Sequence, residues 1–137
     1  MNQSQPPSLT LKVVIRSQDF QSSRHFYGDI LGLPVLESWE EEGGQGCIFG
    51  LGQKSKSGSL EIYQMKEGDR RYSPVFASPF ENDKIDLQLR TENLDSWISG
   101  LQGAWEYSGP QRLPWGERRI TLRDPDNLLI SIYEESS

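Results

Sequence analysis

The amino-acid sequence predicts an α+β fold in which one βαβββ unit is used twice. Residues 11–32 and 85–103 each read as a short alternating strand followed by a helix that ends at a glycine. Two later stretches, "SLEIY" at 59–63 and "LLISIY" at 128–133, share an alternation of apolar and polar residues. The chain therefore repeats both the start and the end of a module.

The chain has 137 residues, a net charge of −6 and one cysteine. This length suits one domain, 1–137, with a first module at 8–66, a linker at 67–82 and a second module at 83–135. We expect no nucleic-acid partner, because the chain is acidic, and no membrane partner, because no apolar run is long enough. Cys47 is expected to be a buried free thiol, and a chain without disulfides suits the cytoplasm.

Both helices carry start and stop signals. Asp19 and Asn93 are suited to cap the free amides of the first turn, and Gly32 and Gly103 suit the left-handed conformation that ends a helix. The apolar faces consist of Phe20, Phe26, Tyr27, Ile30 and Leu31 in the first helix and Leu94, Trp97, Ile98 and Leu101 in the second.

Three strands are expected after each helix. They are placed at 35–41, 47–51 and 59–65 in the first module, and at 105–107, 118–123 and 128–134 in the second. The proline-containing stretch between the modules is expected to wrap the surface.

Strand alternation divides the sheet residues into two faces. The helix-covered face is predicted to hold Val13, Ile15, Ile62, Leu87, Leu89 and Ile132. The opposite face, here called the cup face, is predicted to hold Lys12, Val14, Arg16, Glu61, Tyr63, Asp86, Gln88, Arg90, Ser131 and Tyr133. So many polar side chains on one face of a curved sheet indicate water or a polar ligand there.

The repeated units, together with "SQDFQSSRHFYGDILGLPV" at 17–35 and "LPWGERRITLRDPDNLLISIYE" at 113–134, resemble the vicinal oxygen chelate superfamily. This superfamily includes glyoxalases, extradiol dioxygenases and bleomycin-resistance proteins. The resemblance covers about residues 9–135. It implies two βαβββ modules in tandem that form a curled mixed sheet around a central cavity, commonly completed by the second subunit of a homodimer.

In metal-dependent members of this family, four ligands come from the first and last strands of each module. The resemblance places those positions at Lys12, Glu61, Asp86 and Ser131. A protonated lysine offers no lone pair, serine is a weak ligand, and the single histidine, His25, lies on a predicted helix. We therefore expect no bound metal and no other cofactor, with a magnesium or calcium ion at the two carboxylates as the alternative.

Lys12 has two interpretations. It can form a structural ion pair with Glu61 or Asp86. It can also replace the positive charge of the metal and polarise a carbonyl or phosphate of a ligand, with Glu61 as the catalytic base.

The aromatic residues complete the predicted site. Trp115 in "LPWGERR" is either a turn residue packed over a cavity rim or a cleft residue, together with Arg118, as the resemblance to bleomycin-resistance proteins implies. Trp39 has a related position in the first module. The predicted ligand-binding set is Lys12, Trp39, Glu61, Asp86, Trp115, Arg118 and Ser131.

These observations favour a small-molecule-binding protein of the glyoxalase/bleomycin-resistance type, which binds or sequesters an organic ligand without a metal. The alternative is a glyoxalase- or dioxygenase-like enzyme that holds a metal through Glu61 and Asp86. A third possibility is an interaction module whose cup is filled by its own ion pairs. The sequence leaves open whether any reaction is catalysed.

Overall fold

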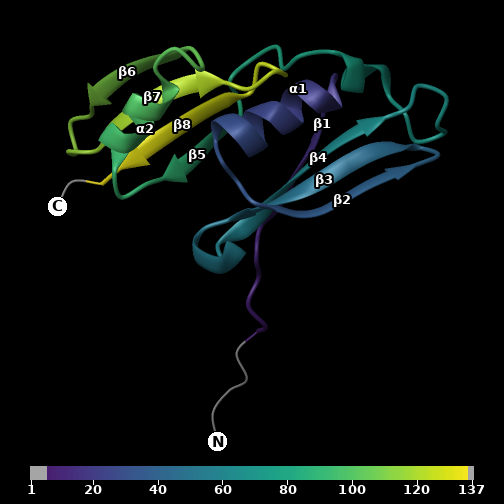
Figure 1. Cartoon of the computed structure of the whole chain (residues 1–137), viewed down its shortest axis with the longest axis horizontal. Helices are drawn as coiled ribbons and strands as arrows, with labels where there is room; N and C mark the ends of the chain where they lie inside the picture. The colour runs from purple at the N-terminus through teal and green to yellow at the C-terminus, as the bar shows by residue number, and fades with distance from the viewer. Residues whose placement is uncertain (1–5, 136–137) are drawn as a thin grey trace, which may run out of the picture.

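The computed structural model describes residues 6–135 as two βαβββ modules that lie side by side (Figure 1). The first module forms a four-stranded mixed sheet in the order β1-β4-β3-β2, in which β1 is parallel to β4 and the other pairs are antiparallel. Its strands are β1 (Lys12–Arg16), β2 (Val35–Glu41), β3 (Gly44–Leu51) and β4 (Gly58–Met65).

The second module repeats this topology in a sheet of its own, in the order β5-β8-β7-β6. Its strands are β5 (Asp86–Arg90), β6 (Tyr107–Arg112), β7 (Arg118–Arg123) and β8 (Leu129–Glu134). The predicted α+β fold with two βαβββ modules is thus confirmed.

One predicted strand is misplaced. The third strand from the C-terminus was expected at 105–107, but β6 starts at Tyr107. Its pairing with β7 shifts between Ser108 and Gln111, across Gly109 and Pro110. Proline has no amide hydrogen for the hydrogen bonds between strands, so the sequence of this segment does not predict a strand. The strand nevertheless continues beyond the irregularity to Arg112.

The helices begin at the predicted residues. Helix α1 (Phe20–Arg24) is capped by Asp19, whose carboxylate accepts a hydrogen bond from the Ser22 amide at 3.3 Å, and it continues as a π-helix over His25–Ile30. Helix α2 (Leu94–Leu101) is capped by Asn93, which accepts from the Ser96 amide at 3.0 Å. Short 3₁₀ turns lie between β3 and β4 at Gln53–Ser55 and between β4 and β5 at Pro74–Ala77.

Each helix start is also tied to the last strand of its own module. The Gln64 side chain of β4 accepts a hydrogen bond from the Phe20 amide at 2.7 Å. The Glu134 carboxylate of β8 accepts from the Leu94 amide at 2.8 Å. These two related contacts use amides that a helix leaves unsatisfied in its first turn, and they fix the helix against the sheet.

The glycines predicted to end the helices have left-handed backbones. Gly32 follows the π-helix with φ +67°, and Gly103 follows α2 with φ +76°. Glycine adopts this conformation without the steric cost that a Cβ atom brings.

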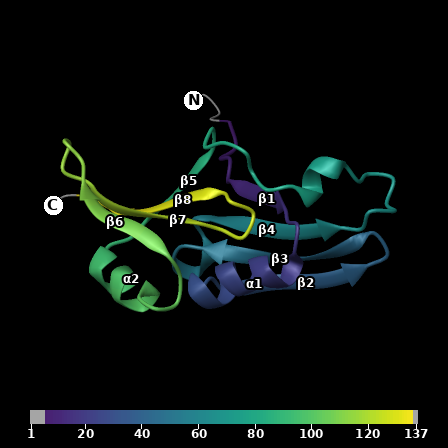
Figure 2. The same cartoon turned by 90° about the horizontal axis from the view of Figure 1, so that it is seen from above.

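The apolar core joins the two modules. Ile15, Ile62 and Ile132 are buried in one cluster, as the alternation predicted. Helix α1 lies where the modules meet (Figures 1 and 2). In the π-helix that continues it, the ring centroid of Phe26 is 4.8 Å from that of Trp105. Because this cluster crosses the module boundary, we propose that the chain is a single domain. No helix within residues 6–135 is both long and apolar enough to cross a membrane.

Candidate functional site

On the cup face of the first module, an ion pair joins the edge strand β1 to its neighbour β4. Lys12 of β1 places Nζ 2.8 Å from Oε1 of Glu61 on β4. The Glu61 side chain is 15% exposed and that of Lys12 is 46% exposed. The lysine is therefore held at the surface of the cup by a carboxylate that is largely shielded from water.

In the second module, the related positions are joined by a hydrogen bond between a hydroxyl group and a carboxylate. The buried Ser131 hydroxyl of β8 donates to Oδ1 of Asp86 on β5 at 3.0 Å. The amide nitrogen of Gln88 donates to the other oxygen of Asp86 at 2.8 Å. Both oxygens of this carboxylate are therefore already accepting hydrogen bonds.

The four predicted positions thus come together as two pairs, one in each sheet. The strand registers show their relationship: Glu61 is opposite Val14 of β1, and Ser131 is opposite Gln88 of β5. The modules hold different chemistry at related positions, a cation with a carboxylate in one and a hydroxyl with a carboxylate in the other.

An aromatic pair lies beside Glu61 on the same face. Trp39 of β2 and Tyr63 of β4 have ring centroids 6.2 Å apart. The Tyr63 hydroxyl donates to the Glu41 carboxylate at 2.8 Å, and Arg71 of the linker approaches Glu41 at 4.0 Å. Burial, followed by the hydrogen bond to Glu41, raises the pKa of Tyr63, so the phenol remains a protonated donor near neutral pH.

Gly46 makes room for this aromatic pair. A Cβ atom at this position would lie 2.8 Å from the Trp39 ring and 2.9 Å from the Tyr63 ring. Only glycine lets both rings lie over β3 in this arrangement. Tyr63, Glu41 and Gly46 were not singled out as site residues from the sequence, although strand alternation had placed Tyr63 on the cup face.

Trp115 lies in the turn between β6 and β7 and is 68% exposed. Its indole nitrogen is 3.5 Å from the Glu117 carboxylate. The structure does not bring it into contact with the Lys12–Glu61 or Asp86–Ser131 pairs.

Arg118 lies on the helix-covered side of β7, at the opposite face from the predicted cleft residues. Its guanidinium pairs with Asp95 of α2 at 3.0 Å and with Glu134 of β8 at 3.3 Å. The neighbouring Arg119 takes the cup-face position, opposite Tyr133, and pairs with Glu117 at 2.6 Å.

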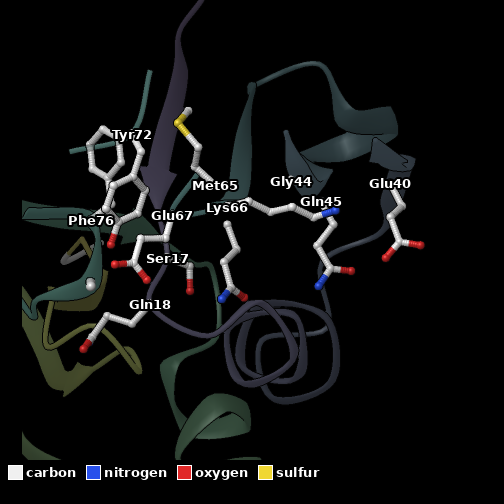
Figure 3. A pocket seen from close by; sticks show the side chains of 12 residues that line it. Ser17, Gln18, Glu40, Gly44, Gln45, Met65, Lys66, Glu67, Tyr72 and Phe76 are labelled. Atoms are coloured by element: carbon white, nitrogen blue, oxygen red, sulfur yellow. The ribbon is translucent and has the colours of Figure 1, made fainter. Parts of the chain in front are cut away.

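A cavity of about 460 Å³ opens at the end of the first module, where the linker covers the ends of β1 and β4 (Figure 3). Tyr72 and Phe76 of the linker form an edge-to-face pair on one wall. Gln18, Gln45 and Glu67 add polar groups around it. None of the four predicted positions lines this cavity.

The donor set at the four positions does not fit a transition metal. The ammonium of Lys12 occupies the contact position at Glu61, and a cation there repels a divalent ion. Asp86 is engaged by Ser131 and Gln88. Among residues 6–135, no three histidine, cysteine, aspartate or glutamate side chains converge in a way that could hold a metal ion.

The comparisons with known proteins agree with this architecture. A family model described as the Glyoxalase/Bleomycin resistance protein/Dioxygenase superfamily matches residues 11–132. The chain belongs to this superfamily. The chain is also 30% identical over 128 residues to the uncharacterized protein YraH of Bacillus subtilis (strain 168), covering 90% of this chain and 96% of that one.

Solved structures share the fold of this superfamily member at lower identity. An antibiotic-binding protein, TnmS3 from Streptomyces sp. CB03234, has a TM-score of 0.71 and 21% identity, covering 97% of this chain and all of the other. A lactoylglutathione lyase from Agrobacterium tumefaciens has a TM-score of 0.68 and 19% identity, with coverages of 94% and 95%. At these identities the likeness shows the fold alone, and that fold serves both a binding protein and an enzyme.

Proposed function

We propose that this superfamily member binds a small organic molecule on its cup face without using a metal ion. The observation that carries the proposal is the Lys12–Glu61 ion pair, which puts a fixed positive charge where metal-dependent relatives are expected to hold a cation. The antibiotic-binding structural neighbour supports a binding role for this fold. The protein would then sequester its ligand and leave it chemically unchanged.

The groups beside the ion pair define the ligand chemistry. Trp39 and Tyr63 offer aromatic faces, and stacking or cation–π contacts with such faces contribute roughly 0.5–2 kcal/mol each. Lys12 and Asp86 would then hold polar groups of the same molecule, and the buried Ser131 hydroxyl would orient the Asp86 carboxylate. A planar ligand with hydrogen-bonding substituents fits this combination.

We further propose that the cup is completed in a homodimer. Strands β1 and β5 are edge strands of their sheets. Val14 of β1, on the cup face, is 40% exposed and leaves apolar surface next to the ion pair, and Leu11 just before β1 is 68% exposed. Unpaired strand edges with apolar surface favour association. Light scattering at micromolar concentration should give twice the mass of one chain, and a monomer mass throughout that range would contradict this.

Bleomycin and a panel of planar aromatic antibiotics provide probes for the binding function. Binding should quench tryptophan fluorescence, and mass spectrometry should recover the probe unchanged. The affinity should fall in Trp39→Ala. A fall in Trp115→Ala as well would place this second predicted aromatic residue at the ligand. A probe that is converted to product by the wild type but not by Glu61→Gln would instead support the enzyme alternative.

The metal content of the purified protein tests the other half of the proposal. Elemental analysis after purification without added metal should find no stoichiometric zinc, nickel, iron or manganese. About one such ion per chain, lost in Glu61→Ala, would overturn the metal-independent assignment.

A further inference from the structure

A second cavity lies between the two modules, and its apolar wall comes from the helix-covered sides of the two sheets. We call it the intermodule cavity, and its volume is about 780 Å³. Module one contributes Val13, Leu33 and Leu51 to its wall, and module two contributes Leu87, Leu89 and Trp97. This volume lies within the range of about 300–1,000 Å³ that is typical of small-molecule sites.

The cavity is open because helix α2 leaves the edge strand β5 partly uncovered. Helix α2 packs on β7 and β8, and α1 packs on β3 and β4. Ile15 of β1 is 4% exposed, whereas the related Leu89 of β5 is only partly buried. The helix-side leucines of β5 therefore present hydrocarbon to the space between the modules instead of to a helix.

The wall is fixed before any ligand arrives. The Trp97 indole nitrogen donates to the Thr91 hydroxyl at 3.1 Å, which also accepts from the Asn93 amide at 3.2 Å. The indole is thus anchored by its polar edge, and its apolar body is left for the cavity. A wall whose aromatic side chain is already held loses little conformational entropy on binding.

The polar groups at the rim are chiefly neutral. Gln53, Ser57 and Ser59 come from the loop between β3 and β4 and the start of β4. Arg90 and Glu92 are the charged residues among those that line the cavity, and they have opposite charges. The lining therefore carries no net charge that selects an ion, and burying an unpaired charge against its leucines would be costly.

We infer that the intermodule cavity is a second ligand site, for an uncharged apolar molecule of drug-like size. Covering the exposed hydrocarbon of its wall supplies the driving force, because removing apolar surface from water is favourable. The hydroxyl and amide groups of the rim can satisfy one or two polar atoms of the ligand. This site shares strand β5 with the cup, because Gln88 lines the cavity and also donates a hydrogen bond to Asp86.

A small molecule fits the cavity better than a protein partner does. A stable protein interface needs about 800 Å² on each side, built around exposed apolar residues. Among residues 6–135, the large exposed apolar side chains are Leu9, Leu11, Val14, Val35, Leu36, Val75, Ile85 and Trp115, and only Leu11 among them lines the cavity. A rim of serine, glutamine and glycine around a leucine-lined hollow suits a ligand that enters it.

The neutral fluorescent dye N-phenyl-1-naphthylamine tests the inference on the full chain. The dye should bind saturably, with one site per chain and enhanced emission. Leu89→Gln and Leu33→Gln, one from each module, should each weaken its affinity at least about tenfold, which corresponds to about 1.4 kcal/mol. Leu36→Gln is the matched control, because it makes the same change at an exposed leucine of β2 outside the cavity, and it should bind like the wild type.

Circular dichroism and light scattering on each variant keep the result interpretable. Leu33 lies in the connection after α1, so Leu33→Gln tests the cavity if Leu89→Gln fails to fold. Absence of saturable binding, or equal loss in Leu33→Gln and Leu36→Gln, would overturn the inference. Dye binding that occurs only when a dimer dissociates would also overturn the inference, because the cavity would then be part of a subunit interface.

Discussion

The hydroxyl of Tyr27 donates a 2.7 Å hydrogen bond to Oδ2 of Asp124 and so ties the helix of the first module to a turn of the second. The other oxygen of Asp124 accepts from the amides of Asp126 and Leu128, both at 2.8 Å. The Asp126 carboxylate in turn accepts from the Gln18 amide, just before α1, at 2.9 Å. Two buried carboxylates therefore bind the modules to each other.

Removing the hydroxyl of Tyr27 should destabilise the protein. Tyr27→Phe leaves one oxygen of the buried Asp124 without its donor, and an unsatisfied buried acceptor costs about 1–3 kcal/mol. Urea denaturation should show this loss in the free energy of unfolding. Tyr72→Phe, which removes a hydroxyl from the partly exposed linker, serves as the control. Equal stability of the two variants would contradict a structural role for the Tyr27–Asp124 bond.

Asp124 should also make stability depend on pH. Burial raises the pKa of Asp124, and the hydrogen bond from Tyr27 only partly offsets this. A carboxyl whose pKa is raised by folding stabilises the fold below its ordinary pKa of about 3.9, and this contribution is lost as the pH rises through the folded-state value.

The Asp124→Asn variant isolates that contribution. The amide keeps an oxygen for the two backbone donors and places its nitrogen at the Tyr27 hydroxyl, which can accept. The free energy of unfolding of the variant, minus that of the wild type, should increase as the pH rises above about 3.9. Urea titrations at several pH values measure this difference. A difference that stays constant across the range would show that Asp124 titrates alike in both states.

The sequence was sufficient for the fold because its signals are local. Asp19, Asn93, Gly32 and Gly103 mark the helix ends through contacts within a few residues. Strand alternation then assigned Ile15 and Ile62 to the core and Lys12 and Glu61 to the opposite face, because neighbouring strand residues point to opposite sides.

The parts that the sequence could not predict depend on distant partners. Arg118 was expected in the cleft, yet its neighbours Asp95 and Glu134 lie on α2 and β8. In a strand, a shift of one position changes the face, so Arg118 and Arg119 could not be distinguished from the motif alone. The acidic turn at 123–127 was likewise not singled out from the sequence, and only the folded chain shows Asp124 and Asp126 to be buried.

Arg118 should therefore influence stability rather than ligand binding. Arg118→Gln removes the cation that contacts Asp95 and Glu134. Glu134 would still accept the hydrogen bond from the Leu94 amide at the start of α2, but it would lose its positively charged partner. Thermal unfolding should show a lower midpoint at low ionic strength, and the difference should shrink as salt screens the pair. The affinity for a cup-face probe should be unchanged. A loss of affinity without a loss of stability would show that Arg118 belongs to the binding site.

Replacing Lys12 should reveal the metal chemistry that the ion pair suppresses. Lys12→His removes the ammonium that lies 2.8 Å from Glu61 and supplies a neutral imidazole beside that carboxylate. Imidazole and carboxylate together are good zinc ligands, whereas a lysine ammonium repels the ion. Isothermal titration at neutral pH should show zinc binding to Lys12→His that is much tighter than to the wild type. Lys66→His, on the segment after β4, controls for the added histidine, and Lys12→His combined with Glu61→Gln should lose the gain. Equal zinc affinity in the wild type and Lys12→His would mean that Lys12 does not exclude the metal.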